Sequence, residues 1–322
     1  MDVTDTLLEW SATIGTLYHR GFLRGGVAEA VVPTAAELDA RFPAAFSSTS
    51  KQWPLFGHRA GVTSYAFWRE VASKLVEDTA LAHDQDAFEE GFSQIYKLFQ
   101  TQEAYQPFPD ALPFLRWARS VDGLKICVIS NATESYQESV LPALGMADYI
   151  DFCVLSKVEG IEKPHAAIFE LAARRAGVEV QHVLHVGNSL NKDYRGATAA
   201  GCRALLLNRS GTSKDADGEI RTIRSLLEAK QVMEEMFTNR PDGATTARCA
   251  RSRSAWGTQR RGCLTTPCCG ILVGSAFLLR IWDSRRRPRA PARERFSFGG
   301  ITLPVRPARS PAGTWLGATL TR

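Results

Sequence analysis

The chain has 322 residues, of which 44% are hydrophobic, so it is long enough to bury one large core or two ordinary ones. Its formal charge of +5 is unevenly distributed. Residues 240–322 contain 16 Arg, no Lys and three acids, a net charge of +13, which leaves about −8 for residues 1–239. Attraction to nucleic acid or to an anionic membrane therefore belongs to the tail, and we expect neither a specific nucleic-acid partner nor a membrane partner.

Cysteine spacing and the amino-terminal sequence both bear on the cellular compartment. The seven cysteines show no paired CxxC spacing, and thiols in apolar runs are typical of a reducing compartment. The first twenty residues carry several acids and no continuous apolar run, unlike a secretion signal. The stretch 270–282 is apolar for only about ten residues, short of the roughly 20 that cross a bilayer. We expect a cytoplasmic protein, whose oligomeric state the sequence leaves open.

Residues 12–102 are rich in helix signals. Thr34 and Glu37 have the spacing of a capping box, in which each side chain binds the other residue's backbone N–H. Apolar residues recur every three or four positions in 64–78 and 86–100, which predicts a small helical bundle. Aromatic residues at this spacing usually form a bundle core, and we expect this for five of them: Trp53, Phe56, Tyr65, Phe67 and Trp68. The alternative is that they close over a substrate.

From about residue 103 strand and helix signals alternate along the chain. Four short apolar segments, each followed by polar residues, are predicted strands: 126–129, 149–155, 182–187 and 203–207. Amphipathic segments lie before or between them and are predicted helices: 112–120, 135–146, 165–178 and 194–202. This alternation is typical of an α/β fold in which right-handed crossover helices connect parallel strands. Beyond residue 240 the periodicity ends, and the Arg-, Pro-, Gly- and Ala-rich tail 240–322 is predicted to be disordered.

Polar residues gather in four clusters, three of them at or soon after the ends of predicted strands. The clusters are Asp2 with Thr4 and Asp5, Ser130 with Asn131, Lys163 before Pro164, and Asn188 with Asp193. Because functional sites of open parallel sheets lie at the carboxyl ends of the strands, we expect the clusters to meet there. Each cluster alone has an ordinary explanation, such as a turn after a strand or the first turn of a helix. His185, inside an apolar strand, is expected to be a core residue.

Together these residue types can carry phosphoryl chemistry. An aspartate attacks a phosphoryl group when a nearby cation screens the repulsion between the two anions. Hydroxyl and amide groups can hold the transferring oxygens, and a lysine supplies a point charge. An acidic residue on the last loop can bind Mg²⁺ through oxygen.

The order of the clusters resembles the haloacid dehalogenase superfamily of aspartyl-nucleophile hydrolases over residues 2–210. Four segments resemble its motifs in chain order: DVTDTL, VISNAT, EKPHAAIF and HVGNSLNKDYRGATAAG. The resemblance implies a Rossmann-like three-layer core, formed by residues 1–11 and 103–230. It also implies that residues 12–102 are the helical cap domain of the type 1 arrangement.

The resemblance also implies roles for individual residues. Asp2 would be the nucleophile that forms an aspartyl-phosphate, and Lys163 would neutralise charge during catalysis. Thr4 stands where phosphatases of the family usually have the aspartate that acts as general acid and base. Ser130 and Asn131 would bind the phosphoryl oxygens. The cofactor would be Mg²⁺, bound by a set of four residues: Asp2, Thr4, Asn188 and Asp193.

Three departures from the family pattern affect these expectations. Thr4 cannot transfer a proton as a carboxyl group does, and Asn188 replaces a metal-binding aspartate, so slow turnover is expected. The family has an apolar strand directly before its nucleophile, whereas Met1 alone precedes Asp2 here. We therefore expect the first strand to be largely missing and the chain to be truncated.

The sequence leads to one main functional hypothesis and two alternatives. The main hypothesis is a Mg²⁺-dependent phosphatase, a phosphoric monoester hydrolase that acts on a small phosphorylated metabolite. The first alternative is a metal-independent dehalogenase of 2-haloacids, because that chemistry needs the aspartate and the lysine but no second carboxylate. The second alternative is a catalytically silent protein that keeps the fold as a binding surface.

Overall fold

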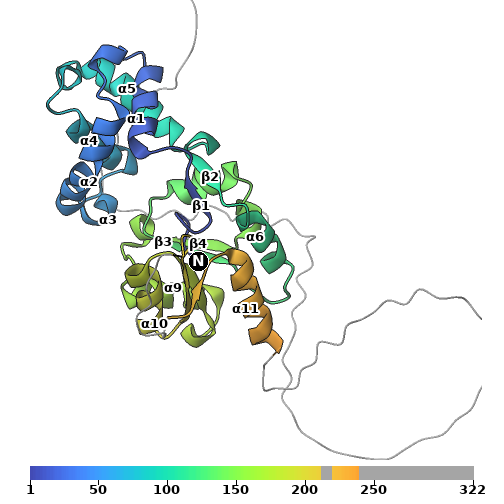
Figure 1. The fold of residues 1–322 in the computed structure, drawn as a ribbon. Coiled ribbons are helices and arrows are strands. Elements are labelled where there is room, and N and C mark those ends of the chain that lie inside the picture. The colour runs from blue at the N-terminus through green and yellow to red at the C-terminus, as the bar shows by residue number, and fades with distance from the viewer. Residues whose placement is uncertain (212–219, 239–322) are drawn as a thin grey trace, which may run out of the picture. The chain divides into compact units, whose positions relative to one another are not determined.

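A parallel sheet between two layers of helices forms the part of the chain that carries the predicted motifs (Figure 1). The computed structural model describes residues 1–211 and 220–238. Within these residues no helix is both long and apolar enough to cross a bilayer. The predicted disordered tail 240–322 and its apolar stretch 270–282 lie outside the described residues.

The strands pair in parallel, as the alternation of strand and helix signals predicts. β3 (Cys127–Ser130) pairs with β4 (Phe152–Leu155), and β5 (Leu184–Gly187) pairs with β6 (Arg203–Leu207). β7 (Thr222–Ile223), which the sequence analysis did not predict, adds to β6. The α/β fold class is confirmed.

Residues 1 and 2 lie between the two groups of strands. The Met1 amino group donates to the Cys127 carbonyl at 2.8 Å, and the Ile129 N–H donates to the Met1 carbonyl at 2.8 Å. On the other side, the Asp2 N–H donates to the Val186 carbonyl at 2.9 Å. The strand before the nucleophile was predicted to be largely missing. Met1 and Asp2 lie in the position of that strand, between β3 and β5. Asp2 therefore lies beside the carboxyl ends of both strands.

Helices cover both faces of this sheet, because successive strand residues point to opposite sides. Val128 packs into the hydrophobic cluster that includes α6 (Ala111–Arg119), whereas Ile129 packs into the cluster that includes α9 (Ala166–Ala176). α11 (Leu226–Thr238), which was not predicted, contributes to the first cluster. Burial on both faces explains why the strand sequences are almost continuously apolar.

Two predicted helices differ from a continuous α-helix. Segment 135–146 forms a π-helical turn, η4 (Tyr136–Val140), and then the short α7 (Leu141–Ala143). The α-helical run is short because Gly145, with a left-handed φ of 66°, ends it soon after Ala143. The segment predicted at 194–202 begins earlier, as a second π-helical turn.

That second turn is η7 (Leu190–Arg195), followed by α10 (Gly196–Ala199). Its early start has a local cause, because the Ser189 hydroxyl accepts a hydrogen bond from the Lys192 N–H and caps the turn. Short helices complete the connections between strands: η5 (Ala147–Tyr149), α8 (Ser156–Glu159) and η6 (Val180–His182).

The segment between β1 and β2 is helical, as predicted, and has a hydrophobic core of its own. Its main helices are α1 (Ile14–Arg24), α2 (Ala35–Gln52), α4 (Ser64–Leu75) and α5 (Gln85–Leu98). α1 packs against α2 and α5, and α2 packs against α4. The capping box of Thr34 and Glu37 is confirmed at the start of α2. Shorter elements join these helices: η1 (Glu29–Val31), α3 (Pro54–Gly57), η2 (Ala80–His83) and η3 (Gln102–Ala104).

A short antiparallel pair connects this helical segment to the sheet. β1 (Leu8–Trp10) follows the Asp2 loop, and β2 (Tyr105–Pro107) brings the chain back beside it. Each strand has three residues, too few for a periodic signal, and the sequence analysis missed both. We retain the division into residues 1–11 with 103–230 and residues 12–102 as a proposal. The separate hydrophobic cluster of the helical segment supports it.

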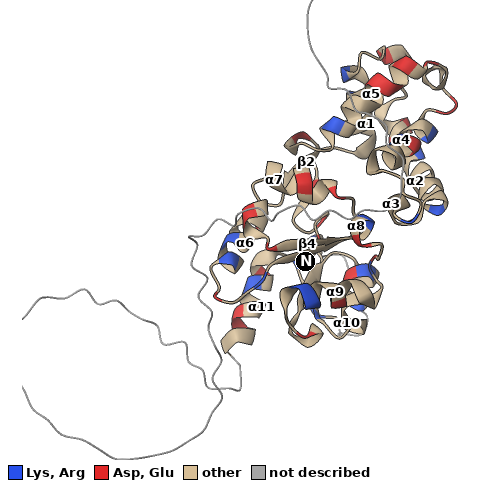
Figure 2. Ribbon diagram, turned by 180° about the vertical axis from the view of Figure 1, so that it is seen from behind, with Lys and Arg blue, Asp and Glu red and all other residues tan. Residues whose placement is uncertain are grey.

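Acidic and basic residues are interspersed along the elements of both the helical segment and the core in the ribbon of Figure 2. Asp2, Lys163 and Asp193 differ from these surface residues, because their side chains are largely or fully buried at one edge of the sheet. The candidate site begins with these three.

Candidate active site

Lys163 links two aspartates at the carboxyl edge of the sheet. Its Nζ lies 2.8 Å from Asp2 Oδ1 and 2.7 Å from Asp193 Oδ1, and its side chain is only 2% exposed. Asp193 is completely buried, whereas the Asp2 side chain is 14% exposed. Of the two carboxylates, Asp2 is therefore the one that a reactant can reach.

Asp193 is fixed by contacts to both of its oxygens. Oδ1 also lies 2.9 Å from His185 Nε2, and Oδ2 accepts a hydrogen bond from the Ser189 N–H at 2.9 Å. Burial raises the pKa of the Asp193 carboxyl, but the His185 hydrogen bond and the Lys163 charge outweigh it and hold that pKa below its usual value. Burial lowers the pKa of His185 to about 4, so its ring is neutral at pH 7. Asp193 is thus a charged anchor for Lys163.

Ser130 ends β3 and Asn131 follows it, beside this group. The Asn131 side chain makes two hydrogen bonds with the Lys163 backbone, accepting from its N–H at 2.8 Å and donating to its carbonyl at 2.9 Å. This amide pair holds the backbone of Lys163 at the edge of the sheet. Ser130 is 4% exposed at the end of β3, one residue beyond the Ile129 N–H that binds Met1. Their predicted contact with phosphoryl oxygens stays a prediction.

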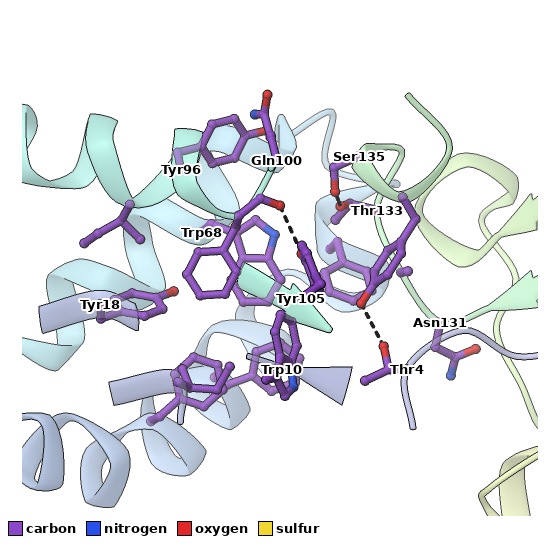
Figure 3. Close-up of a pocket in the computed structure, with 18 of the residues that line it drawn as sticks. Thr4, Trp10, Tyr18, Trp68, Tyr96, Gln100, Tyr105, Asn131, Thr133 and Ser135 are labelled. Atoms are coloured by element: carbon purple, nitrogen blue, oxygen red, sulfur yellow. Dashed lines mark hydrogen bonds between the residues drawn. The ribbon is translucent and has the colours of Figure 1, made fainter. Parts of the chain in front are cut away.

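The Thr4 hydroxyl forms a hydrogen bond with the Tyr136 hydroxyl. The two hydroxyl oxygens are 2.7 Å apart, and burial raises the pKa of the Tyr136 phenol, so it stays protonated at neutral pH (Figure 3). Sequence reasoning missed Tyr136, because 132 positions separate it from Thr4. The place expected for a second aspartate thus holds two neutral hydroxyl groups.

Asp5 is a second carboxylate close to Asp2 that the sequence analysis noted but did not assign. It has a left-handed backbone with φ of 57°, which aspartate adopts more readily than most residues. Its Oδ2 accepts a hydrogen bond from Asn188 Nδ2 at 3.4 Å. Burial raises the pKa of Asp5, and the neighbouring charges of Asp2 and Glu9 raise it further. The only sequence signal for this position was the second acid of DVTDTL.

The oxygen donors around Asp2 suit a Mg²⁺ ion in chemical type. In residues 1–211 and 220–238 no group of three or more His, Cys, Asp or Glu side chains is arranged to hold a metal ion. Mg²⁺, however, is usually bound through only one or two carboxylates and keeps several water ligands. Asp2, Asp5 and Asn188 offer two carboxylates and an amide oxygen. The ligand roles expected for Thr4 and Asp193 stay predictions. Both oxygens of Asp193 are engaged by protein groups, and the Thr4 hydroxyl is bonded to Tyr136.

A cavity of about 270 Å³ lies next to the site, between the sheet and the helical segment (Figure 3). Thr4 and Asn131 belong to its lining on the side of the sheet, and aromatic side chains such as Trp10 and Trp68 line the rest. Of the five aromatic residues expected in the bundle core, Phe67 is fully buried there, and Trp53, Phe56 and Trp68 pack against that core. Phe56 and Trp68 also border the cavity. Tyr65 is 38% exposed.

Comparison with known protein families assigns the chain to a class of hydrolases. The model of the haloacid dehalogenase-like hydrolase family matches residues 1–201. The chain belongs to this family, and the resemblance noted in the sequence is confirmed.

Two curated proteins are similar to the chain in sequence. The chain is 32% identical over 206 residues to haloacid dehalogenase-like hydrolase domain-containing protein 3 of Homo sapiens, covering 64% of this chain and 79% of the relative. It is 38% identical over 112 residues to glyceraldehyde 3-phosphate phosphatase of Methanothermobacter thermautotrophicus, covering 35% and 49%.

A solved structure of a dehalogenase is similar to the chain in fold. The 2-haloacid dehalogenase of Pseudomonas syringae pv. Tomato DC3000 superimposes with a TM-score of 0.53 and 27% sequence identity, over 73% of this chain and 96% of that one. Phosphatases and a dehalogenase are therefore both among the relatives.

Proposed function

We propose that the protein is a Mg²⁺-dependent phosphatase that hydrolyses a phosphomonoester through a phosphorylated Asp2. The observation that carries this proposal is the contact of 2.8 Å between the partly exposed Asp2 carboxylate and the buried Lys163 ammonium. An ammonium at this distance screens the repulsion between the carboxylate and a phosphoryl group. The family includes phosphatases, which supports the choice of reaction.

Two displacements at phosphorus make up the reaction. In the first, an Asp2 oxygen attacks the phosphorus, and the bond from phosphorus to the leaving oxygen breaks with its electron pair on that oxygen. In the second, water attacks the phosphorus and the bond to the Asp2 oxygen breaks. The second step releases inorganic phosphate and restores the carboxylate.

The charge of the site explains the need for a metal ion. Asp2, Asp5 and Asp193 carry three negative charges when ionised, and Lys163 carries one positive charge. A phosphomonoester dianion approaching this net negative site is repelled unless a further cation is present. When bound, Mg²⁺ supplies that charge and polarises the phosphoryl oxygens. Asp2 and the Asp5–Asn188 pair are the side chains that would hold it.

Phosphate release tests this proposal. With Mg²⁺ present, 4-nitrophenyl phosphate should be hydrolysed, and Asp2→Asn should reduce kcat by about 10³-fold or more because the nucleophile is removed. Chelation of Mg²⁺ should also abolish release. Asp148→Asn makes the same chemical change at an exposed position and should leave kcat unchanged. Release that survives in Asp2→Asn, or that is unaffected by the chelator, would refute the proposal.

A metal-independent dehalogenase is the second candidate, favoured by the neutral Thr4–Tyr136 pair in place of a second carboxylate. That reaction needs a 2-haloacid, whose carboxylate requires a cationic partner. Among the described residues that line the cavity there is no Lys, Arg or His. The phosphatase is therefore preferred. Halide release from 2-chloropropionate in the presence of a chelator would decide for the dehalogenase.

A silent binding protein is the remaining candidate. It predicts that neither phosphate nor halide is released and that Asp2 forms no adduct with beryllium fluoride. The lysine-linked pair of aspartates argues against it, because a buried ammonium held between two carboxylates costs desolvation energy that a mere scaffold does not need.

A further inference from the structure

We propose that the substrate is a phosphomonoester of an uncharged aromatic alcohol, an aryl phosphate whose ring occupies the cavity beside Thr4. This inference rests on the proposed phosphatase function and names the substrate class of the same site. Two independent features carry it: the chemical character of the cavity and the missing proton donor at Thr4.

The cavity lining is aromatic and carries no formal charge. Eleven of its nineteen residues are Phe, Tyr or Trp, and among these described residues there is no Asp, Glu, Lys, Arg or His. Phe46 stacks on Phe42 with ring centroids 6.0 Å apart and on Trp68 at 5.7 Å. A leaving group with an ammonium or carboxylate would lose its hydration here without gaining a charged partner. An aromatic ring would bury apolar area against aromatic faces.

Much of the hydrogen-bonding capacity of the lining is already used within the protein. Thr4 bonds with Tyr136, Thr133 Oγ1 lies 2.8 Å from Ser135 Oγ, and the Tyr105 hydroxyl donates to the Phe99 carbonyl (Figure 3). These five residues are therefore engaged before a substrate binds. Of the other polar lining residues, Trp10, Tyr18, Trp68 and Tyr96 are aromatic, and Gln100 offers an amide.

The size of the cavity fits one or two aromatic rings. An apolar cavity of about 150 Å³ accepts benzene, and this one has a volume of about 270 Å³. Thr4 and Asn131 place one wall of the cavity beside the Asp2–Lys163 pair, because Thr4 is two residues from Asp2 and Asn131 bonds the Lys163 backbone. A ring in the cavity can therefore be joined to a phosphoryl group at Asp2.

The lack of a carboxyl proton donor at Thr4 also favours aryl phosphates as substrates. A phenol has a pKa near 10, as in the tyrosine side chain, so phenolate leaves without being protonated far more readily than an aliphatic alkoxide. General acid help typically contributes about 10²- to 10⁴-fold, and Thr4 with Tyr136 cannot supply it as a carboxyl group does. The site is therefore suited to leaving groups that need no proton.

Kinetics with two sets of phosphomonoesters test the inference. The aryl set is phenyl, 4-nitrophenyl and 2-naphthyl phosphate, and the alkyl set is glyceraldehyde 3-phosphate, O-phosphoserine and glycerol 3-phosphate. We expect kcat/KM for 2-naphthyl phosphate to exceed that for each alkyl phosphate by about 10²-fold or more. Among aryl phosphates, kcat/KM should rise steeply as the pKa of the leaving phenol falls.

Variants separate the two features. Thr4→Asp restores a proton donor and should reduce the ratio of aryl to alkyl kcat/KM by about tenfold or more. Phe46→Leu removes aromatic area from the cavity and should raise KM for 2-naphthyl phosphate severalfold, with less effect on phenyl phosphate. Phe237→Leu changes an exposed phenylalanine on α11, outside the cavity, and is the matched control.

Binding of 2-naphthol, followed by calorimetry in Asp2→Asn, checks the cavity when catalysis is blocked. We expect binding that weakens when Phe46→Leu is added and persists when Phe237→Leu is added. Lack of 2-naphthol binding would overturn the inference. Asp2-dependent hydrolysis of O-phosphoserine or glyceraldehyde 3-phosphate as fast as that of aryl phosphates would overturn it while the phosphatase stands. If no phosphomonoester of either set is hydrolysed, the phosphatase itself fails, and the inference fails with it.

Discussion

At the scale of single residues, the site depends on one buried positive charge shared by two carboxylates. Lys163 is 2% exposed and Asp193 is fully buried, so neither charge is compensated by water. Removing one partner of a buried ion pair is costly because the other charge remains buried and unpaired. Lys163 therefore contributes to the stability of the fold, and under the proposed function it also supports the reactivity of Asp2.

Lys163→Met should lower the free energy of unfolding by about 3 to 5 kcal/mol, because Asp193 is left without its counter-ion. Urea unfolding followed by circular dichroism measures this change. Lys192→Met, at an exposed position on the same turn as Asp193, should change stability by no more than about 0.5 kcal/mol. Equal stability of the two variants would show that the buried pair contributes little.

His185 gives the stability a pH dependence. Burial lowers its pKa from 6.5 to about 4, so between these values the unfolded chain binds a proton that the folded protein does not. Stability should therefore fall as the pH is lowered from about 6.5 to 4, by about 3 kcal/mol in total. Urea midpoints across this range test it. His185→Gln should flatten the slope, whereas His182→Gln, at an exposed position, should not; an unchanged slope in His185→Gln would contradict the assignment.

At the scale of secondary structure, local signals were reliable where they extended over several residues. The capping box at the start of α2 is such a signal: the Glu37 N–H donates to Thr34 Oγ1, and Glu37 Oε2 accepts from the Thr34 N–H. Both residues are neighbours in sequence, so the interaction follows from the local backbone alone.

Thr34→Ala should therefore destabilise the protein by about 1 kcal/mol, because the first turn of α2 loses its cap. Ser47→Ala, an exposed change within the same helix, is the control and should have a smaller effect, or a slight gain from helix propensity. Thermal unfolding of the two variants gives the comparison. A larger loss in Ser47→Ala would contradict the role given to the cap.

Elements and contacts that depend on distant segments were not predictable in the same way. β1 and β2 have three residues each. They form because residues 8–10 pair with residues 105–107, which follow the whole helical segment in sequence. The motif order identified Asp2, Lys163 and Asp193, which the structure brings together. The Thr4–Tyr136 and Asp193–His185 contacts could not be predicted from the sequence, because no local pattern indicates a side-chain contact that the tertiary fold creates. Asp5 was visible only as an extra acid in a loop.

At the scale of the whole folded part, α8 contacts the helical segment at Phe56, one of the residues that line the cavity. Lys157 Nζ donates to the Phe56 carbonyl at 2.8 Å and to the Val62 carbonyl, and His58 Nδ1 lies 2.7 Å from the Lys157 carbonyl. Phe56 itself borders the cavity and has a left-handed backbone with φ of 55°. The Lys157 contacts therefore hold one wall of the proposed substrate cavity.

Lys157→Met should loosen this wall, since two carbonyl groups lose their donor. Hydrogen exchange should accelerate in peptides covering residues 55–63, and KM for 2-naphthyl phosphate should rise severalfold while the urea midpoint changes little. Lys97→Met, at an exposed position near the end of α5, should alter neither quantity. Unchanged exchange in Lys157→Met would mean that other contacts hold the wall.

The identity of the nucleophile is tested most directly by trapping the intermediate. The protein is mixed with 2-naphthyl phosphate and Mg²⁺ and quenched in acid within one turnover, and its peptides are then analysed by mass spectrometry. The account predicts a phosphoryl group on the peptide that begins at Met1, located at Asp2 by fragmentation, and no adduct in Asp2→Asn. Phosphate release with no phosphoryl group on Asp2, or with one on another residue, would contradict it.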